Sequence, residues 1–111
     1  MGNLLKVVLS TFFVLIITLS QPAWAADTAN GAQVFSAQCA GCHIKGSNII
    51  RWGKNLHTKA LKKYGMDSVE AIALIVTNGK NNMSAYKDRL SEQQIQDVSA
   101  YVLEQAAVDW R

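Results

Sequence analysis

Hydrophobic residues in most of this chain recur at three- and four-residue steps, which is the spacing of one face of an α-helix. This periodicity predicts four short helices, over residues 29–39, 56–64, 67–78 and 91–106. No stretch alternates between hydrophobic and polar residues for long enough to predict a β-strand. We therefore expect an all-α fold.

Capping residues support the boundaries of these helices. Gly65 follows the second helix, and glycine is common just beyond a helix C-terminus. Short polar side chains that accept hydrogen bonds from a first helical turn precede the other three helices. The expected N-caps are Asp27 or Thr28 for the first helix, Asp67 with Glu70 for the third, and Ser91 with Gln94 for the last.

The first 25 residues have a different pattern, that of a secretory signal peptide. Lys6 precedes an apolar run over residues 7–19, and the small residues Ala23 and Ala25 end the segment. As a membrane anchor, this run of 13 residues would span only about 20 Å of a hydrocarbon core about 30 Å thick. We expect residues 1–25 to be a cleaved signal peptide, which leaves residues 26–111 as one exported domain.

Composition limits what this domain can be. The chain has 111 residues, of which 17% are charged and 50% are hydrophobic. It is therefore neither disordered nor long enough for two cores. Domains this small usually need a disulfide, a metal or a cofactor for stability. Two long irregular segments, residues 43–55 and 79–90, would become ordered if they wrapped around a cofactor.

The charges are unevenly distributed along the chain. Residues 28–66 hold six basic residues and no acidic residue, whereas residues 67–111 hold seven acidic and four basic residues. Such a dipole can orient a carrier towards a redox partner, although runs of charge are often only a solvated surface. The formal net charge of +3 is too small to predict nucleic-acid binding.

The motif Cys39-Ala40-Gly41-Cys42-His43 carries the chemistry of the domain. It is the attachment motif of haem c, in which each cysteine forms a thioether bond with one vinyl group of the porphyrin. The spacing delivers His43 to the iron as the proximal ligand, and neutral imidazole is a good iron ligand. We predict one haem c, covalently bound to Cys39 and Cys42.

Three other roles for the cysteines fit less well. A disulfide between Cys39 and Cys42 would close a very short loop and would stabilise little. A thioredoxin-like redox pair belongs in a βαβ unit, which the periodicity does not predict. A zinc site would need the distant His57 in addition to His43, with irregular spacing.

The sixth ligand of the iron must come from another part of the chain. Beyond residue 25 the candidates are Met66, Met83 and His57. Met66 lies between two helices, where methionine more often fills a core, and His57 lies in a lysine-rich segment. Met83 lies in the irregular segment 79–90, which has no other evident purpose. We favour Met83, whose thioether would favour ferrous iron and raise the reduction potential.

From residue 29 onward the chain resembles the cytochrome c6 family, which are class I c-type cytochromes. The resemblance rests on the haem motif and on the stretch Val76-Thr77-Asn78-Gly79-Lys80-Asn81 that precedes Met83. The matching pieces elsewhere are residues 30–36, residues 65–72, residues 97–103 and Trp110.

This resemblance implies a small class I cytochrome c fold, with four short helices wrapped around one haem. The first and last helices would cross near Gly31, Phe35 and Tyr101. It also implies His43 and Met83 as the axial ligands. Arg89 matches an arginine that the family uses in docking to partners.

Two positions depart from the usual family pattern. Ser84 follows Met83 where the family usually has proline, so this ligand loop is less restricted. Ile75 stands where the family usually has a glutamine near the haem, so an amide that can hydrogen-bond there is missing. In the related cytochromes c6A, c6B and c6C, an aliphatic residue here accompanies a lower reduction potential. Ile75 is therefore a candidate for tuning the potential.

The resemblance implies a monomeric one-electron carrier and not an enzyme, because iron with two axial ligands has no open site. Its implied partners dock transiently in the thylakoid lumen or periplasm: the cytochrome b6f complex as donor, and photosystem I or a terminal oxidase as acceptor. Stable membrane insertion is not expected after cleavage. One alternative is a lower-potential variant in another redox or signalling step. The other is a ligand-binding or peroxidatic haem protein in which Met83 does not bind the iron.

Overall fold

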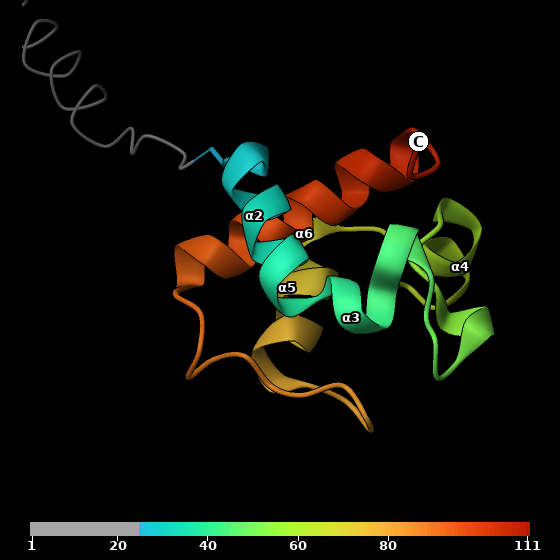
Figure 1. Cartoon of the computed structure of the whole chain (residues 1–111), viewed down its shortest axis with the longest axis horizontal. Helices are drawn as coiled ribbons and strands as arrows, with labels where there is room; N and C mark the ends of the chain where they lie inside the picture. Colours follow the sequence, from blue (N-terminus) through green and yellow to red (C-terminus); the bar gives the residue numbers. More distant parts are fainter. Residues whose placement is uncertain (1–24) are drawn as a thin grey trace, which may run out of the picture.

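The computed structural model describes residues 25–111, and these residues are helical with no β-strand among them. Residues 1–24 of the predicted signal peptide lie outside the described residues. The all-α prediction is confirmed (Figure 1). The helices, with the two 3-10 turns as η, are α2 (Thr28–Gln38), α3 (Ala40–His43), η1 (Ile44–Gly46), η2 (Trp52–Lys54), α4 (Thr58–Lys63), α5 (Val69–Asn78) and α6 (Glu92–Ala107). None of these helices is both long and apolar enough to cross a bilayer.

The predicted caps are confirmed at three helix ends. The Asp27 side chain accepts a hydrogen bond from the backbone N–H of Asn30 at the start of α2. Ser91 and Gln94 form the reciprocal capping box of α6, each side chain accepting from the backbone N–H of the other. Gly65 follows α4 with a φ of +68°, a conformation that glycine adopts without strain.

At α5 the predicted N-cap, Asp67 with Glu70, is wrong. The cap is Ser68, whose hydroxyl accepts a hydrogen bond of 3.1 Å from the N–H of Ala71. The backbone of Ser68 is extended, which brings the hydroxyl to the third residue of the helix. Serine and aspartate cap helices about equally well, so the two adjacent candidates could not be separated by residue type.

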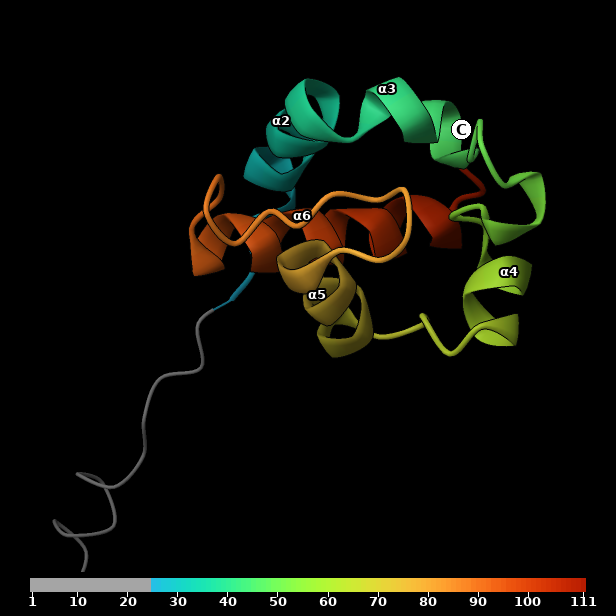
Figure 2. The ribbon, with the colours of Figure 1, turned by 90° about the horizontal axis from the view of Figure 1, so that it is seen from below.

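Helix α6 lies between α2 and α5 and packs against both (Figure 2). Gly31 allows the close approach of α2, because a Cβ there would overlap the backbone carbonyl of Asp97 and the side chain of Tyr101. The crossing that the resemblance implied is therefore present. The apolar core lies around this crossing and consists of Val34, Phe35, Leu61, Ile72, Ala73, Val76, Leu90, Ile95, Val98, Val102 and Ala106.

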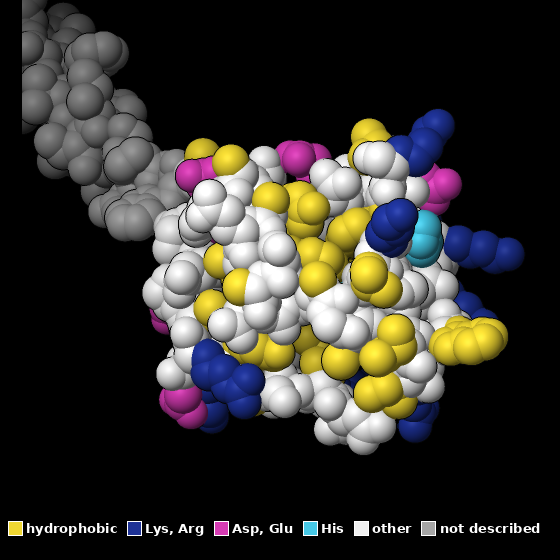
Figure 3. All heavy atoms as spheres, viewed as in Figure 1, with side chains coloured by type: hydrophobic (Ala, Val, Ile, Leu, Met, Phe, Trp, Pro, Cys, Tyr) yellow, Lys and Arg dark blue, Asp and Glu magenta, His cyan; other side chains and the backbone are white. Residues whose placement is uncertain are grey.

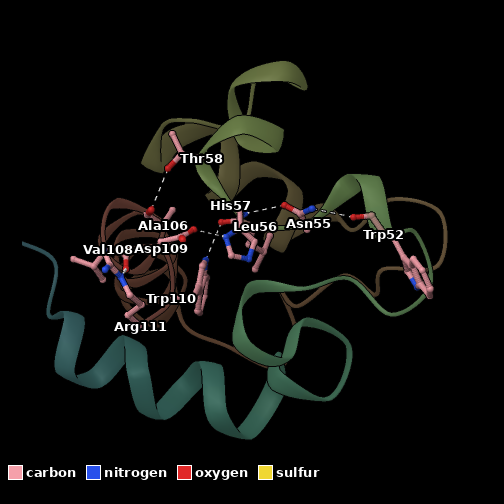
Figure 4. A network of polar contacts seen from close by, with 10 residues as sticks. All are labelled: Trp52, Asn55, Leu56, His57, Thr58, Ala106, Val108, Asp109, Trp110 and Arg111. Atoms are coloured by element: carbon pink, nitrogen blue, oxygen red, sulfur yellow. Dashed lines mark hydrogen bonds and ion pairs between the residues drawn. The ribbon is translucent and has the colours of Figure 1, made fainter.

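Three aromatic rings join the C-terminus to this core. The ring centroids of Phe35, Tyr101 and Trp110 lie 5.1 to 6.0 Å apart. The indole N–H of Trp110 donates a hydrogen bond of 3.0 Å to the carbonyl of Leu56 (Figure 4). Gly46 faces the same indole, and a Cβ at this position would overlap it. Trp110 thus fixes the segment between the haem motif and α4 to the end of the chain.

Asp97 fixes the start of α2 to α6. Its carboxylate is 1% exposed and accepts three hydrogen bonds of 2.8 Å, from the N–H of Asp27 and the side-chain amides of Asn30 and Gln93. Burial alone would raise the pKa of Asp97. The three hydrogen bonds outweigh burial because they favour the ionised form, so the pKa lies below its ordinary value.

Candidate functional site

Cys39 and Cys42 lie where α2 gives way to α3. Cys39 is the C-cap of α2, and its N–H donates a hydrogen bond of 2.9 Å to the carbonyl of Phe35. Cys42 lies within the single turn of α3. Burial raises the pKa of the Cys39 thiol to about 11, whereas Cys42 is exposed. The two thiols are free and do not form a disulfide with each other.

The His43 imidazole is oriented by a backbone carbonyl. Its Nδ1 lies 2.9 Å from the carbonyl oxygen of Ser47. Because a carbonyl only accepts hydrogen bonds, Nδ1 carries the proton, and Nε2 of the neutral ring carries the lone pair. Metal-binding histidines are commonly held through their other ring N–H in this way. Ser47 is a site residue that the sequence analysis missed.

Met83 lies in a tight turn after α5. The backbones of Lys80 and Met83 exchange two hydrogen bonds, of 3.0 and 2.9 Å. The turn begins at Gly79, which has a φ of +69° and whose Cβ would overlap the carbonyl of Met83. The Met83 side chain is half-buried and packs against the core. Gly79 therefore determines the path of the segment that carries the predicted sixth ligand.

Tyr86 links this segment to the haem motif. Its hydroxyl donates a hydrogen bond of 3.0 Å to the carbonyl of Gln38, the residue before Cys39. Its backbone N–H donates to the carbonyl of Val76 on α5 at 2.9 Å. Like Met83 and Cys39, Tyr86 is partly buried against the core. The haem motif and the Met83 segment are far apart in sequence, and this hydrogen bond joins them.

The other two candidate ligands have contacts of their own. Nδ1 of His57 lies 2.9 Å from a carboxylate oxygen of Asp109, near the C-terminus (Figure 4). Met66 is partly buried against the core, and its N–H donates to the carbonyl of Leu61 at 2.7 Å. These contacts agree with the surface and core roles expected for the two residues. The assignment of Met83 as the ligand stays a prediction.

Ile75 and Arg89, the predicted tuning and docking residues, both adjoin the Met83 segment. Ile75 is half-buried on α5, and its carbonyl accepts a hydrogen bond of 2.7 Å from the N–H of Gly79. Arg89 is exposed, and its guanidinium carbon lies 5.2 Å from the centroid of the Tyr86 ring. Their roles in tuning and docking stay predictions.

The donor set suits a covalently attached haem. Cys39 and Cys42 offer two free thiols on adjacent turns, His43 offers the Nε2 nitrogen of its ring, and Met83 offers a thioether from the segment after α5. Within residues 25–111, no three His, Cys, Asp or Glu side chains are grouped so that they could hold a metal ion.

The family was identified by comparison with known proteins. A family model described as cytochrome c oxidase, cbb3-type, subunit III matches residues 26–102. Over its whole length the chain is 72% identical to a protein named cytochrome c6-like from Nostoc sp. (strain PCC 7120), all of which is covered. It is 49% identical to a cytochrome c6 from Synechococcus sp. (strain PCC 6312), over 99% of this chain and 98% of that one. The chain belongs to the cytochrome c6 family.

A solved structure supports the same family. The crystal structure of cytochrome c6C from Synechococcus sp. PCC 7002 is 60% identical and has a TM-score of 0.71, over 73% of this chain and 99% of that one. The predicted class I cytochrome c fold is therefore confirmed. Cytochromes c6 are electron carriers, and membership of this family of c-type cytochromes implies covalently bound haem c.

Proposed function

We propose that this cytochrome c6 family member carries single electrons on one haem c, attached to Cys39 and Cys42 and bound axially by His43 and Met83. The hydrogen bond between His43 and Ser47 supports this most strongly, because it orients the ring through Nδ1 and leaves Nε2 available to a metal, in a motif with two free thiols. When bound, haem c supplies an iron that alternates between the ferrous and ferric states.

The residues of the site determine how that exchange proceeds. The Ser47 carbonyl holds the proton on Nδ1 of His43, which orients the ring and makes Nε2 a stronger donor. The Met83 thioether favours the ferrous state. Gly79 and Tyr86 hold the Met83 segment in place, so the ligand need not rearrange when the charge changes. His43 and Met83 would together hold the iron with no position left for a substrate, and the haem would then supply one-electron exchange, as in a carrier and not in an enzyme.

The Met83 assignment is tested with Met83→Ala, and Met66→Ala serves as the matched control. Both methionines are partly buried against the same core, so both variants lose similar packing. We expect carbon monoxide to bind the reduced, haem-loaded Met83→Ala protein and to leave the spectra of wild type and Met66→Ala unchanged. Rapid binding to the reduced wild type would show an open iron and would support the ligand-binding alternative.

Two roles are candidates for this carrier. One is transfer from the cytochrome b6f complex to photosystem I or a terminal oxidase. The other is a lower-potential step of a different redox or signalling process. The second is favoured because the chain is 72% identical to a cytochrome c6-like protein and 60% identical to a cytochrome c6C, against 49% and 53% for two cytochromes c6. The half-buried aliphatic side chain of Ile75, beside the Met83 segment, supports the same choice.

Spectroelectrochemical titration of the haem-loaded protein beside an ordinary cytochrome c6 separates the two roles. About 59 mV is a tenfold change in the equilibrium constant of a one-electron couple. We expect a midpoint more than about 120 mV below the reference, and an upward shift in Ile75→Gln but not in Leu74→Gln, whose side chain is exposed on the same helix. A wild-type midpoint within about 59 mV of the reference would support the photosystem I role.

The proposed carrier acts outside the cytoplasm, in a thylakoid lumen or a periplasm, after removal of residues 1–25. Cleavage before Ala26 would leave the N-terminus one residue ahead of Asp27, which is anchored to Asp97. Mass spectrometry of the protein purified from the exported fraction should give a chain that begins at Ala26. A full-length chain retained in the membrane fraction would contradict the signal peptide and indicate an anchor.

A further inference from the structure

Residues 44–65 form one end of the domain, opposite the start of α2 (Figure 1 and Figure 2). We call this segment, which contains η1, η2 and α4, the cationic end. Trp52 is 83% exposed, more than any other large hydrophobic residue in the described part of the chain. Ile49 and Ile50 beside it are 55% and 54% exposed. The indole of Trp52 points away from the polar network that holds the neighbouring residues (Figure 4).

Basic residues lie in the same segment as the exposed side chains of Trp52, Ile49 and Ile50, which we call the apolar tip. The cationic end contains no acidic residue and six basic ones, which are Lys45, Arg51, Lys54, Lys59, Lys62 and Lys63. The Nζ atoms of Lys54 and Lys63 lie over the ring of Tyr64, 5.2 and 5.4 Å from its centroid. Since Lys54 belongs to the same turn as Trp52, this contact places Tyr64 and α4 beside the tip. Figure 3 shows several Lys and Arg side chains, with exposed hydrophobic groups, on the side of the molecule where α4 lies in Figure 1.

The acidic residues lie mostly elsewhere. Seven of the eight are in residues 67–111, and the eighth is Asp27 at the start of α2. Asp109 reaches the border of the cationic end, where its carboxylate lies 2.9 Å from His57. The charges are therefore unevenly distributed along residues 25–111, and the basic segment also carries the most exposed aromatic side chain of these residues.

We propose that the cationic end docks reversibly on an anionic membrane surface, with Trp52 among the lipid headgroups. Tryptophan prefers the membrane interface, and lysine and arginine close to an anionic leaflet are attracted to it. A side chain that projects from the surface can enter a soft lipid interface directly. A protein partner would need a matching pocket to receive it. The cationic end contains basic and no acidic residues, so this end would face the anionic lipid.

Sedimentation with vesicles tests this docking surface on the haem-loaded mature protein. Vesicles of phosphatidylcholine with about one quarter phosphatidylglycerol are compared at low salt with vesicles of phosphatidylcholine alone, and bound protein is read from haem absorbance. We expect binding only to the anionic vesicles, weakened at least tenfold in Trp52→Ala. Leu74→Ala, which truncates an exposed leucine on α5, should bind like wild type.

Paired charge reversals test whether the position of the charges matters. Lys59→Glu with Lys62→Glu alters the cationic end, whereas Lys80→Glu with Lys87→Glu makes the same change in net charge elsewhere on the exposed surface. About one kcal/mol per basic residue near an anionic leaflet corresponds to roughly fivefold in affinity. We therefore expect at least a 25-fold loss in the first pair (about fivefold per residue) and less than about fivefold in the second.

Three results would overturn the proposal. The first is no binding to anionic vesicles, and the second is equal weakening by the two charge-reversal pairs. The third is unchanged vesicle binding in Trp52→Ala. If vesicles are not bound, but Trp52→Ala slows electron exchange with a detergent-solubilised redox complex, the cationic end docks on a protein. The midpoint potential is measured in parallel, and it should be unchanged in Trp52→Ala, in Leu74→Ala and in the pair Lys59→Glu with Lys62→Glu.

Discussion

Replacing Asp97 by alanine tests how far one buried carboxylate holds α2 on α6. The change removes the acceptor of three hydrogen bonds of 2.8 Å. Hydrogen bonds to a charged group contribute about 1.5–3 kcal/mol each, but the donors on Asp27, Asn30 and Gln93 are partly or fully exposed and regain water. We therefore expect the free energy of unfolding at pH 7 to fall by about 2–4 kcal/mol, well below the sum of three buried bonds.

Denaturant unfolding of the haem-loaded protein, followed by far-UV circular dichroism, measures this loss. Asp109→Ala is the matched control, because Asp109 is 74% exposed and pairs with His57 at the surface. An exposed contact of this kind contributes less than about 1 kcal/mol. A loss of less than about 1 kcal/mol in Asp97→Ala, equal to that of the control, would refute the reasoning.

The difference in unfolding free energy between wild type and Asp97→Ala is predicted to depend on pH. The pKa of Asp97 lies below its ordinary value of 3.8, so its stabilisation is complete above that value and is lost as the pH falls through the lower folded-state pKa. The difference between wild type and Asp97→Ala should be constant from about pH 7 to about pH 5 and shrink below about pH 4. A difference that persists unchanged at about pH 2 would show that the carboxylate charge is not its cause.

Two further predictions use pairs of glycines. Gly31→Ala should lower the free energy of unfolding by about 1–3 kcal/mol, because its Cβ would overlap the carbonyl of α6, whereas Gly53→Ala faces open space and should change little. Gly79→Ala should displace Met83 and let reduced haem bind carbon monoxide, which its absorption spectrum would show. Gly65→Ala, with a similar φ of +68° but open surroundings, should cost only about 1–2 kcal/mol and keep the wild-type spectrum. Identical spectra for the last two variants would contradict the role given to Gly79.

Much of the fold was predictable because the helices bury one periodic face and end at residues with clear capping chemistry. Ser91 with Gln94 and Gly65 illustrate this, since both signals are local. The N-cap of α5 was not predictable, because Asp67 and Ser68 are adjacent and cap about equally well. The one-turn α3 and the 3-10 turns were not predicted either, since segments this short have no periodicity to detect.

The site was predictable where residue type determines the chemistry, as in the haem motif and the two methionine candidates. The orientation of His43 was not predictable, because the acceptor is a backbone carbonyl and any residue at position 47 provides one. The contact between Tyr86 and Gln38 joins segments far apart in sequence, which only the packing of α2, α5 and α6 brings together. Gly79 had a weak signal, since a glycine directly after the predicted helix 67–78 is a common helix stop and does not by itself indicate the close contact with Met83.

Potentiometric titration of the haem-loaded wild type, followed in the visible spectrum, tests the central claim most directly. The claim is that His43 and Met83 keep both axial positions filled while one electron enters and leaves. We predict a single reversible one-electron wave, with the same two spectra in the oxidative and reductive directions. Hysteresis between the two directions, or a third spectrum typical of iron that has lost an axial ligand, would contradict the claim.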